Sequence, residues 1–215
     1  NQTTIVPYTL SNNFDYYSKQ GYNADAEIIE EILTKGNLSV PQGTVLDYNK
    51  DGCIDNLTII LDNTWKATTE GETTPSELLS YPGAHKSTYQ GSKTLNGLLV
   101  RNYNVLGANT AFSSLGTGVI CHEFLHSLGY PDLYLETSTG PVTPVGWWDI
   151  MAASRPLRFP LAYMRHKVSG WLPIDTVTKD TSGLTLSPAT SPTGNRAFIL
   201  KPPQSSAEFF VIEYR

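Results

Sequence analysis

The chain has 215 residues, of which 40% are hydrophobic and 11% aromatic, and this is enough for one globular core. The formal net charge is -5 and no run of Lys or Arg is present, which excludes binding to a nucleic-acid backbone. No apolar stretch reaches the roughly 18 residues that a membrane span needs.

Composition and the two chain ends favour a protein that acts outside the cell. Charged residues are only 16% of the chain, a balance common in secreted proteins. The sequence starts at Asn1 without a signal segment and ends in the strand-like run AEFFVIEYR, so we expect that both ends have been trimmed. Its two cysteines, Cys53 and Cys121, form either a disulfide or two buried thiols.

The N-terminal part is predicted to contain one amphipathic helix and one buried strand. Residues 24–35, ADAEIIEEILTK, place their isoleucines and leucine on one helical stripe, with acidic residues early and Gly36 as a stop. Residues 56–63, NLTIILDN, form a strand, and the unbroken run Ile59-Ile60-Leu61 indicates burial on both faces.

Between this helix and this strand, the run DYNKDGCIDN spaces oxygen-bearing groups around a glycine in the manner of a calcium loop. The groups that would bind the ion are Asp47, Asn49, Asp51, Asp55 and the carbonyl of Cys53. Thr58 stands where an EF-hand has its bidentate glutamate, and a strand follows, so the loop is not an EF-hand. Hard oxygen ligands favour a structural Ca²⁺; the alternative is an Asx-rich turn with solvated carboxylates.

Three further segments lead to the centre of the chain. Residues 62–97 are rich in Thr, Gly, Pro and Ser and are expected to run along the surface. Residues 97–107, GLLVRNYNVLG, form either a second strand pair or one irregular edge strand. Residues 116–129, GTGVICHEFLHSLG, are predicted to be a helix that ends at Gly129.

That helix carries His122, Glu123 and His126 in the pattern His-Glu-x-x-His. Residues four apart lie one turn apart on the same face, so the two imidazoles can hold one Zn²⁺. Glu123 lies at the rim of this face, where its carboxylate can take a proton from a zinc-activated water without binding the metal. Apolar residues fill the other faces, which predicts burial there. The alternative is a chance match on a solvated helix.

A catalytic zinc needs a third protein ligand. Glu136 precedes TSTGP and lacks the helical context that a downstream glutamate ligand requires. Gly129 permits a left-handed turn that brings the chain back under the metal, and Asp132 follows three residues later. We therefore predict His122, His126 and Asp132 as the zinc ligands. The order His-Glu-x-x-His-x-x-Gly-x-x-Asp resembles the metzincin signature, with aspartate in place of the third histidine.

The C-terminal third is predicted to be rich in short strands. Residues 137–147 form a Gly- and Pro-containing loop, and residues 160–168 form a helix that begins with proline. Beyond the helix, TVT, LTLSPA, AFILKP and EFFVIEY are predicted strands. This order of elements predicts one α+β domain over residues 1–215, of which the part at 170–215 is β-rich.

The chain more specifically resembles the immune inhibitor A family of secreted zinc metallopeptidases. The resemblance rests on HEFLHSLGYPDLY, GWWDIMA, LAYMRHKVSGWL, DYNKDGCIDNLTII and EFFVIEYR, which extend over most of the chain. It implies a metzincin-like fold, with a twisted mixed sheet packed on the active-site helix. It also implies an extended cleft that binds a peptide along an edge strand.

The resemblance assigns Met151 to the tight turn that metzincins place beneath the zinc; the alternative is an ordinary core residue. Asp149, in the same turn, either orients a zinc histidine or hydrogen-bonds to the backbone of the turn. Some metzincins carry an oxyanion-stabilising tyrosine two residues after the methionine, where this chain has Ala153. Tyr163, His166 and His85 are the substitutes that the sequence offers, and His166 is expected on an exposed helix face.

Together these features predict a secreted, monomeric zinc endopeptidase that hydrolyses protein or peptide substrates. Glu123 is its general base and then its general acid. One alternative is a non-catalytic protein- or glycan-binding module with a vestigial or structural zinc site, against which the presence of Glu123 argues. The other is hydrolysis of a non-peptide amide, which a closed pocket instead of an extended groove would favour.

Overall fold

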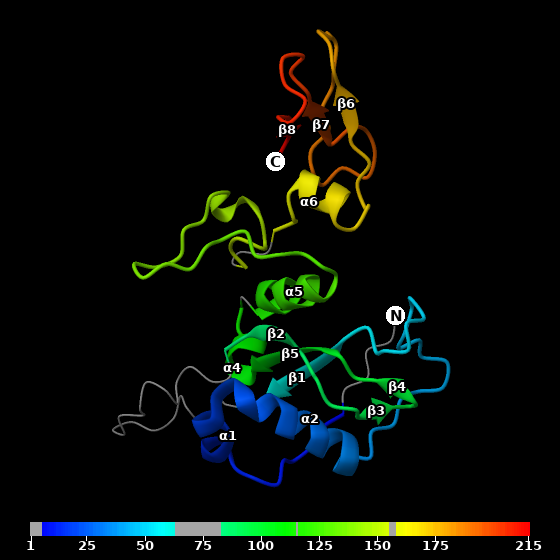
Figure 1. The fold of residues 1–215 in the computed structure, drawn as a ribbon, viewed down its shortest axis with the longest axis vertical. Coiled ribbons are helices and arrows are strands. Elements are labelled where there is room, and N and C mark those ends of the chain that lie inside the picture. Colours follow the sequence, from blue (N-terminus) through cyan, green and yellow to red (C-terminus); the bar gives the residue numbers. More distant parts are fainter. Residues whose placement is uncertain (1–5, 63–82, 115, 155–157) are drawn as a thin grey trace. The chain divides into compact units, whose positions relative to one another are not determined.

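The computed structural model describes residues 6–62, 83–114, 116–154 and 158–215. Contacts divide the chain into two compact units, of which the first ends at Ser127 and the second comprises Leu128–Ser154 and Arg158–Arg215. Each unit combines short helices with a small sheet (Figure 1), so the predicted mixture of helices and strands is confirmed. The single domain over residues 1–215 stays a prediction.

The first unit contains most of the helices that the structure describes. Its helical elements are α1 (Phe14–Gln20), η1 (Gly21–Asn23), α2 (Ala24–Lys35), α4 (Ala108–Ala111) and α5 (Gly116–Ser127). Its strands are β1 (Leu57–Leu61), β2 (His85–Thr88), β3 (Thr94–Leu95), β4 (Leu98–Leu99) and β5 (Asn102–Gly107). Helix α2 has the predicted bounds, and its last turn closes where the amide of Gly36 donates to the carbonyl of Ile32.

Strand β5 is the centre of a three-stranded mixed sheet with the order β1-β5-β2. It runs parallel to β1 and antiparallel to β2, with His85 opposite Val105. Of the two descriptions of residues 97–107, the single irregular edge strand is wrong, because β5 is flanked on both sides. Two strands, β4 and β5, are present as the other description expects, but β4 pairs with β3 and not with β5. The prediction that residues 62–97 only run along the surface is wrong for β2 and β3, which form strands within this range. Residues 63–82 of the same range lie outside the described part of the chain.

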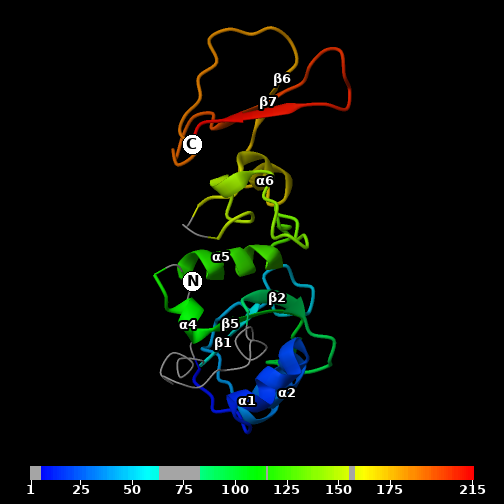
Figure 2. The ribbon, with the colours of Figure 1, turned by 90° about the vertical axis from the view of Figure 1, so that its left-hand side faces the viewer.

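Helices cover both faces of this sheet: α5 lies on one side and α1 and α2 on the other (Figures 1 and 2). On the α2 side, the core contains Ile28, Ile29, Ile59, Tyr103 and Val105. On the α5 side, Leu106 packs with Ala111 and Val119. Because side chains alternate along a strand, the central strand buries both of its faces, and α5 is held directly against the sheet.

Two predictions of burial are wrong. Ile60 is 43% exposed, whereas Ile59 and Leu61 are buried, so β1 buries one face only. The outer position of β1 in the described sheet leaves its second face without a full cover. On α5, Phe124 is 44% exposed, because the helix contacts the sheet through the side that carries Val119.

The second unit places a short helix against a three-stranded sheet. Its elements are η3 (Gly146–Trp148), α6 (Ala162–Lys167), β6 (Asp175–Val177), β7 (Ala197–Leu200) and β8 (Phe210–Glu213). The strand order is β6-β7-β8, with β6 parallel and β8 antiparallel to β7. Ala162 of α6 packs with Leu172, Ala197 and Ile199.

The sequence-based prediction for the second unit holds for the loop at 137–147, for the helix and for three of the four strands. The run LTLSPA is not a strand. Its only β-type pairing among the described residues is an isolated bridge between Pro188 and Tyr214. Proline has no amide hydrogen to donate to a ladder, which limits strand pairing at this point. None of the described helices is long and apolar enough to cross a membrane.

Candidate metal centre

Helix α5 places His122 and His126 side by side. Their ring centroids are 4.8 Å apart and the ring planes are nearly perpendicular, at 89°. His122 is buried and His126 is half-buried. Val119 and Leu125 of the same helix are buried, and Val119 packs with Leu106 and Ala111. The spacing of one helical turn therefore has the predicted consequence that both imidazoles share a face.

A left-handed glycine ends this helix and redirects the chain. Gly129 has φ +89°, a conformation that costs a residue with a Cβ about 1–2 kcal/mol. The next residue, Tyr130, is only 1% exposed, and its hydroxyl is hydrogen-bonded to the hydroxyl of Ser169 at 2.7 Å. This anchor fixes the start of the returning segment, two residues before Asp132.

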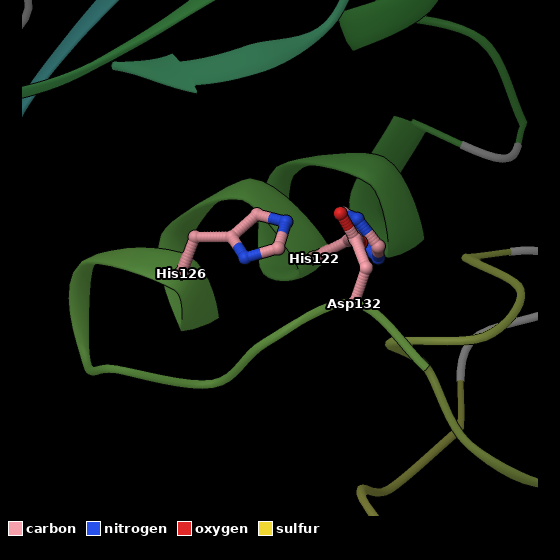
Figure 3. A group of neighbouring side chains, drawn as sticks. All are labelled: His122, His126 and Asp132. Carbon is pink, nitrogen blue, oxygen red and sulfur yellow. The ribbon is translucent and has the colours of Figure 1, made fainter. Parts of the chain in front are cut away.

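The returning segment brings Asp132 beside the two histidines (Figure 3). One ligand atom from each of His122, His126 and Asp132 can be chosen so that all three lie within 4.8 Å of one another. Among the described residues, this is the group of His, Cys, Asp and Glu side chains with the spacing of a metal site. The structure thus brings together the three residues predicted as ligands.

The donor set fits zinc. Two imidazole nitrogens and one carboxylate oxygen are the ligand types that catalytic zinc sites use, with a fourth position left for water or substrate. Ligands at about 2.1 Å from one ion are at most about 4.2 Å apart, so small side-chain rotations close this group onto one ion. His122 is buried, His126 is half-buried and Asp132 is exposed. Of the three side chains, that of Asp132 is therefore the most accessible to solvent.

Glu123 is buried, at 6% exposure, on the same helix turn as His122. Its negative charge is one of the causes that raise the pKa of His85. Glu123 directly follows His122 and precedes Phe124 on the helix that carries both candidate histidine ligands, and its role as general base stays a prediction.

Met151 lies in a tight turn and is completely buried, at 0% exposure. Asp149 shapes this turn, because its Oδ1 accepts a hydrogen bond of 2.7 Å from the amide of Met151. The carbonyl of Met151 in turn accepts from the amide of Leu133 at 2.9 Å, next to Asp132. Of the two roles considered for Asp149, the structure shows the bond to the turn's own backbone.

The residues considered as oxyanion stabilisers all have other contacts. The ring of Tyr163 packs on Phe209, with centroids 5.2 Å apart. His166 is half-buried, and its Nδ1 lies 3.0 Å from the carbonyl of Leu172, so the predicted exposed position is wrong. His85 belongs to a buried polar network of its own.

That network joins α2 to the central sheet. His85 Nε2 lies 2.7 Å from Asp25 Oδ2, and its Nδ1 lies 2.7 Å from the carbonyl of Gly83. Tyr103 donates to the same Asp25 oxygen at 3.0 Å, and burial with the Asp25 charge raises the pKa of Tyr103 to about 12. Sequence reasoning missed this network because Asp25 resembles an ordinary acid of a first helical turn and lies 60 positions from His85.

Both ring nitrogens of His85 face acceptors, which favours the protonated imidazolium. Burial lowers the pKa of His85, but the hydrogen bonds to Asp25 and Gly83 and the charges of Asp25 and Glu123 outweigh it, so the pKa is raised above 6.5. The ring also contacts Tyr22 and Tyr103.

We therefore expect the first unit to lose stability as the pH rises. A raised pKa in the folded state contributes stability that is fully present below about pH 6.5 and is lost as the pH passes the raised value. The measurement is the free energy of unfolding from pH 5.5 to 8.5. The His85→Gln variant cannot titrate and should show a flatter dependence; an unchanged slope in this variant would contradict the assignment.

The predicted calcium loop is folded by its own carboxylates. Asp47 accepts from the amides of Asp51 and Gly52 at 3.1 and 2.9 Å, and Asp51 accepts from the amide of Cys53 at 2.8 Å. The Cys53 amide lowers the pKa of Asp51, together with Asn49. Asp55 closes the loop by accepting from the amide of Tyr48 at 3.0 Å. This is the hydrogen bonding of an Asx-rich turn, and calcium binding stays a prediction.

Cys53 and Cys121 are free and half-buried, so of the two alternatives the structure has thiols and not a disulfide. Burial raises the pKa of both thiols. Neither is therefore disposed to form a thiolate near neutral pH.

Comparison with known proteins identifies a family. Residues 43–156 match the family described as immune inhibitor A peptidase M6, catalytic domain. The matched range includes the metal centre, the Met151 turn and the Asx-rich loop at 47–55. A comparison with curated proteins finds no match.

Proposed function

Because the chain belongs to the immune inhibitor A family of peptidases, and is therefore a metallopeptidase, we propose that it is a zinc-dependent endopeptidase acting on proteins. The observation that carries this proposal is the grouping of His122, His126 and Asp132, whose ligand atoms lie within 4.8 Å of one another. The centre falls inside the range that matches the family.

The proposed mechanism assigns separate tasks to the protein groups. His122, His126 and Asp132 would hold the metal. Zinc, when bound, polarises the peptide carbonyl and lowers the pKa of a water ligand to about 7. Glu123 would accept a proton from the attacking water and pass it to the leaving amine. Met151, fixed by Asp149, supports the segment that carries Asp132.

The test of this proposal is the mass analysis of products from an unfolded protein incubated with the purified chain and zinc. An endopeptidase produces internal fragments from the start of the reaction. Release of single terminal residues would contradict the endopeptidase assignment. Intact substrate in the presence of bound zinc would instead favour a binding module or a hydrolase of non-peptide amides.

We also propose that the loop at 47–55 binds Ca²⁺ as a structural ion. The support is the sequence pattern and the convergence of Asp47, Asp51 and Asp55 on one turn. A ligand at 100 times its dissociation constant stabilises by about 2.7 kcal/mol, and each kcal/mol shifts the Tm of a chain of this size by about 2–4 °C.

We therefore expect millimolar Ca²⁺, but not Mg²⁺, to raise the Tm of the zinc-loaded protein by several degrees. The Asp51→Asn variant should lose this response, whereas Asp180→Asn, at an exposed site in the second unit, should keep it. Equal wild-type Tm values with and without Ca²⁺ would leave the loop as an Asx-rich turn.

Secretion and a monomeric state complete the proposal. Secretion is supported by the low content of charged residues, 16%, and by the sequence resemblance. It is tested by expressing the complete gene product in its natural host and comparing culture medium with cells. Sedimentation of the purified chain tests the monomer; a dimer mass would contradict it.

A further inference from the structure

Glu213, which ends β8, and Arg215, two residues later, bind backbone groups that precede and follow the Met151 turn in the chain. The guanidinium of Arg215 donates to the carbonyl of Trp148, to that of Phe159 at 3.2 Å and to that of Pro160 at 2.9 Å. Arg215 also forms an ion pair with Glu213. The side chains of Arg215 and Glu213 are only 15% and 13% exposed. We call these two residues the C-terminal clamp.

The clamp and Asp149 bind the same backbone segment, which lies at the start of α6. Glu213 Oε2 accepts from the amide of Ala162 at 2.6 Å, and Asp149 Oδ2 accepts from the preceding amide, that of Leu161, also at 2.6 Å. Asp149 is fully buried, at 0% exposure, and its second oxygen holds the amide of Met151. Two carboxylates therefore fix adjacent amides at the start of α6, and one of them also fixes the methionine turn.

A continuous path of bonds leads from the clamp to the metal centre. Arg215 fixes Trp148, which directly precedes Asp149 in the chain. Asp149 shapes the turn, and the carbonyl of Met151 then accepts from the amide of Leu133, the residue after Asp132. Every bond on this path lies within the second unit. The path ends at the backbone next to Asp132, which is the most exposed member of the metal group.

We propose that Glu213 and Arg215 are positioning residues that hold Asp132 where it can bind zinc. This inference rests on the proposed function. Helix α5 holds the two histidines in place, but it ends before Asp132. Asp132 lies in the loop that follows Gly129, so it needs other contacts to fix its position. Outer partners that orient metal ligands typically change metal affinity by about 10–100-fold when they are lost.

Arg215→Lys tests the geometry of the clamp without changing its charge. A lysine ammonium is a single point donor on a flexible stem and cannot span the carbonyls of Trp148, Phe159 and Pro160 together. The matched control is Arg196→Lys in the same unit, because Arg196 donates to one backbone carbonyl, that of Ser191, away from the metal centre. Glu213→Gln and the exposed Glu208→Gln form a second pair.

Two measurements are made on each protein. Competition with a chromophoric chelator gives the zinc dissociation constant, which we expect to be about 10–100-fold weaker in Arg215→Lys and Glu213→Gln and unchanged in both controls. Hydrogen exchange of the metal-free protein gives the protection of the Leu133 amide, which we expect to fall in the same two variants. Circular dichroism and the Tm of the metal-free proteins confirm that each variant is folded.

A double-mutant cycle separates positioning through Asp132 from a general loss of structure. If the clamp acts through Asp132, Arg215→Lys has no further effect on zinc binding once Asp132→Asn is present. An equal effect in both backgrounds would overturn the inference, as would an unchanged zinc dissociation constant in Arg215→Lys. A wild-type protein that binds no zinc would overturn the proposed function and the inference with it, so the two failures are distinguishable.

Discussion

Replacing Glu123 with glutamine is expected to reduce peptide hydrolysis by about 10²–10⁴-fold, the usual contribution of a positioned general acid-base group. Glutamine keeps the size of the side chain and one acceptor oxygen but cannot take up a proton. The zinc content should stay at the wild-type level, because Glu123 is not among the grouped ligands. The measurement is kcat/KM on an unfolded protein substrate, with zinc determined on the same samples.

The matched control for this variant is Glu136→Gln, an exposed acid in the loop that follows the metal centre. It should retain wild-type activity and zinc. Because Glu123 is 6% exposed, the Tm of the variant is measured as well, so that unfolding is distinguished from a loss of chemistry. Wild-type rates in a folded, zinc-loaded Glu123→Gln protein would show that another group transfers the proton.

Replacing Asp132 with alanine is expected to weaken zinc binding by more than about 100-fold, beyond the range seen for outer partners of metal ligands. Two histidines on one helix then remain, and zinc loses the only charged ligand of the set. Asp132 is exposed, so the substitution should leave the Tm of the metal-free protein nearly unchanged. Chelator competition gives the zinc dissociation constant directly.

Glu136→Ala is the decisive comparison for this second prediction. Glu136 is the nearest downstream acid, and a different class of zinc peptidase would use such a glutamate as the third ligand. We expect Glu136→Ala to bind zinc like the wild type. The reverse result, tight binding in Asp132→Ala and weak binding in Glu136→Ala, would assign the third ligand to Glu136.

The metal group could be predicted because its three members lie within eleven consecutive residues. Helical periodicity alone places His122 beside His126, and a glycine that adopts φ +89° accounts for the return of the chain to Asp132. These are local rules, and a local rule needs no knowledge of the rest of the fold.

The supporting networks could not be predicted, because they join residues far apart in sequence. Asp25 meets His85 across 60 positions, and Arg215 reaches Trp148 across 67. Strand β2 was missed for a different reason: it lies inside the polar segment 62–97, and its four residues carry too weak a pattern by themselves. The exposure of Ile60 likewise depends on which sheet face the helices cover, which periodicity does not specify.

The central claim is tested most directly by measuring hydrolysis of an unfolded protein before and after removal of metal with a chelator, with zinc determined on the same sample. We predict one zinc ion per chain, loss of internal cleavage when it is removed, and recovery when one equivalent of zinc is returned. Cleavage that persists in the zinc-free protein would contradict the account, as would a fully zinc-loaded protein that leaves the substrate intact.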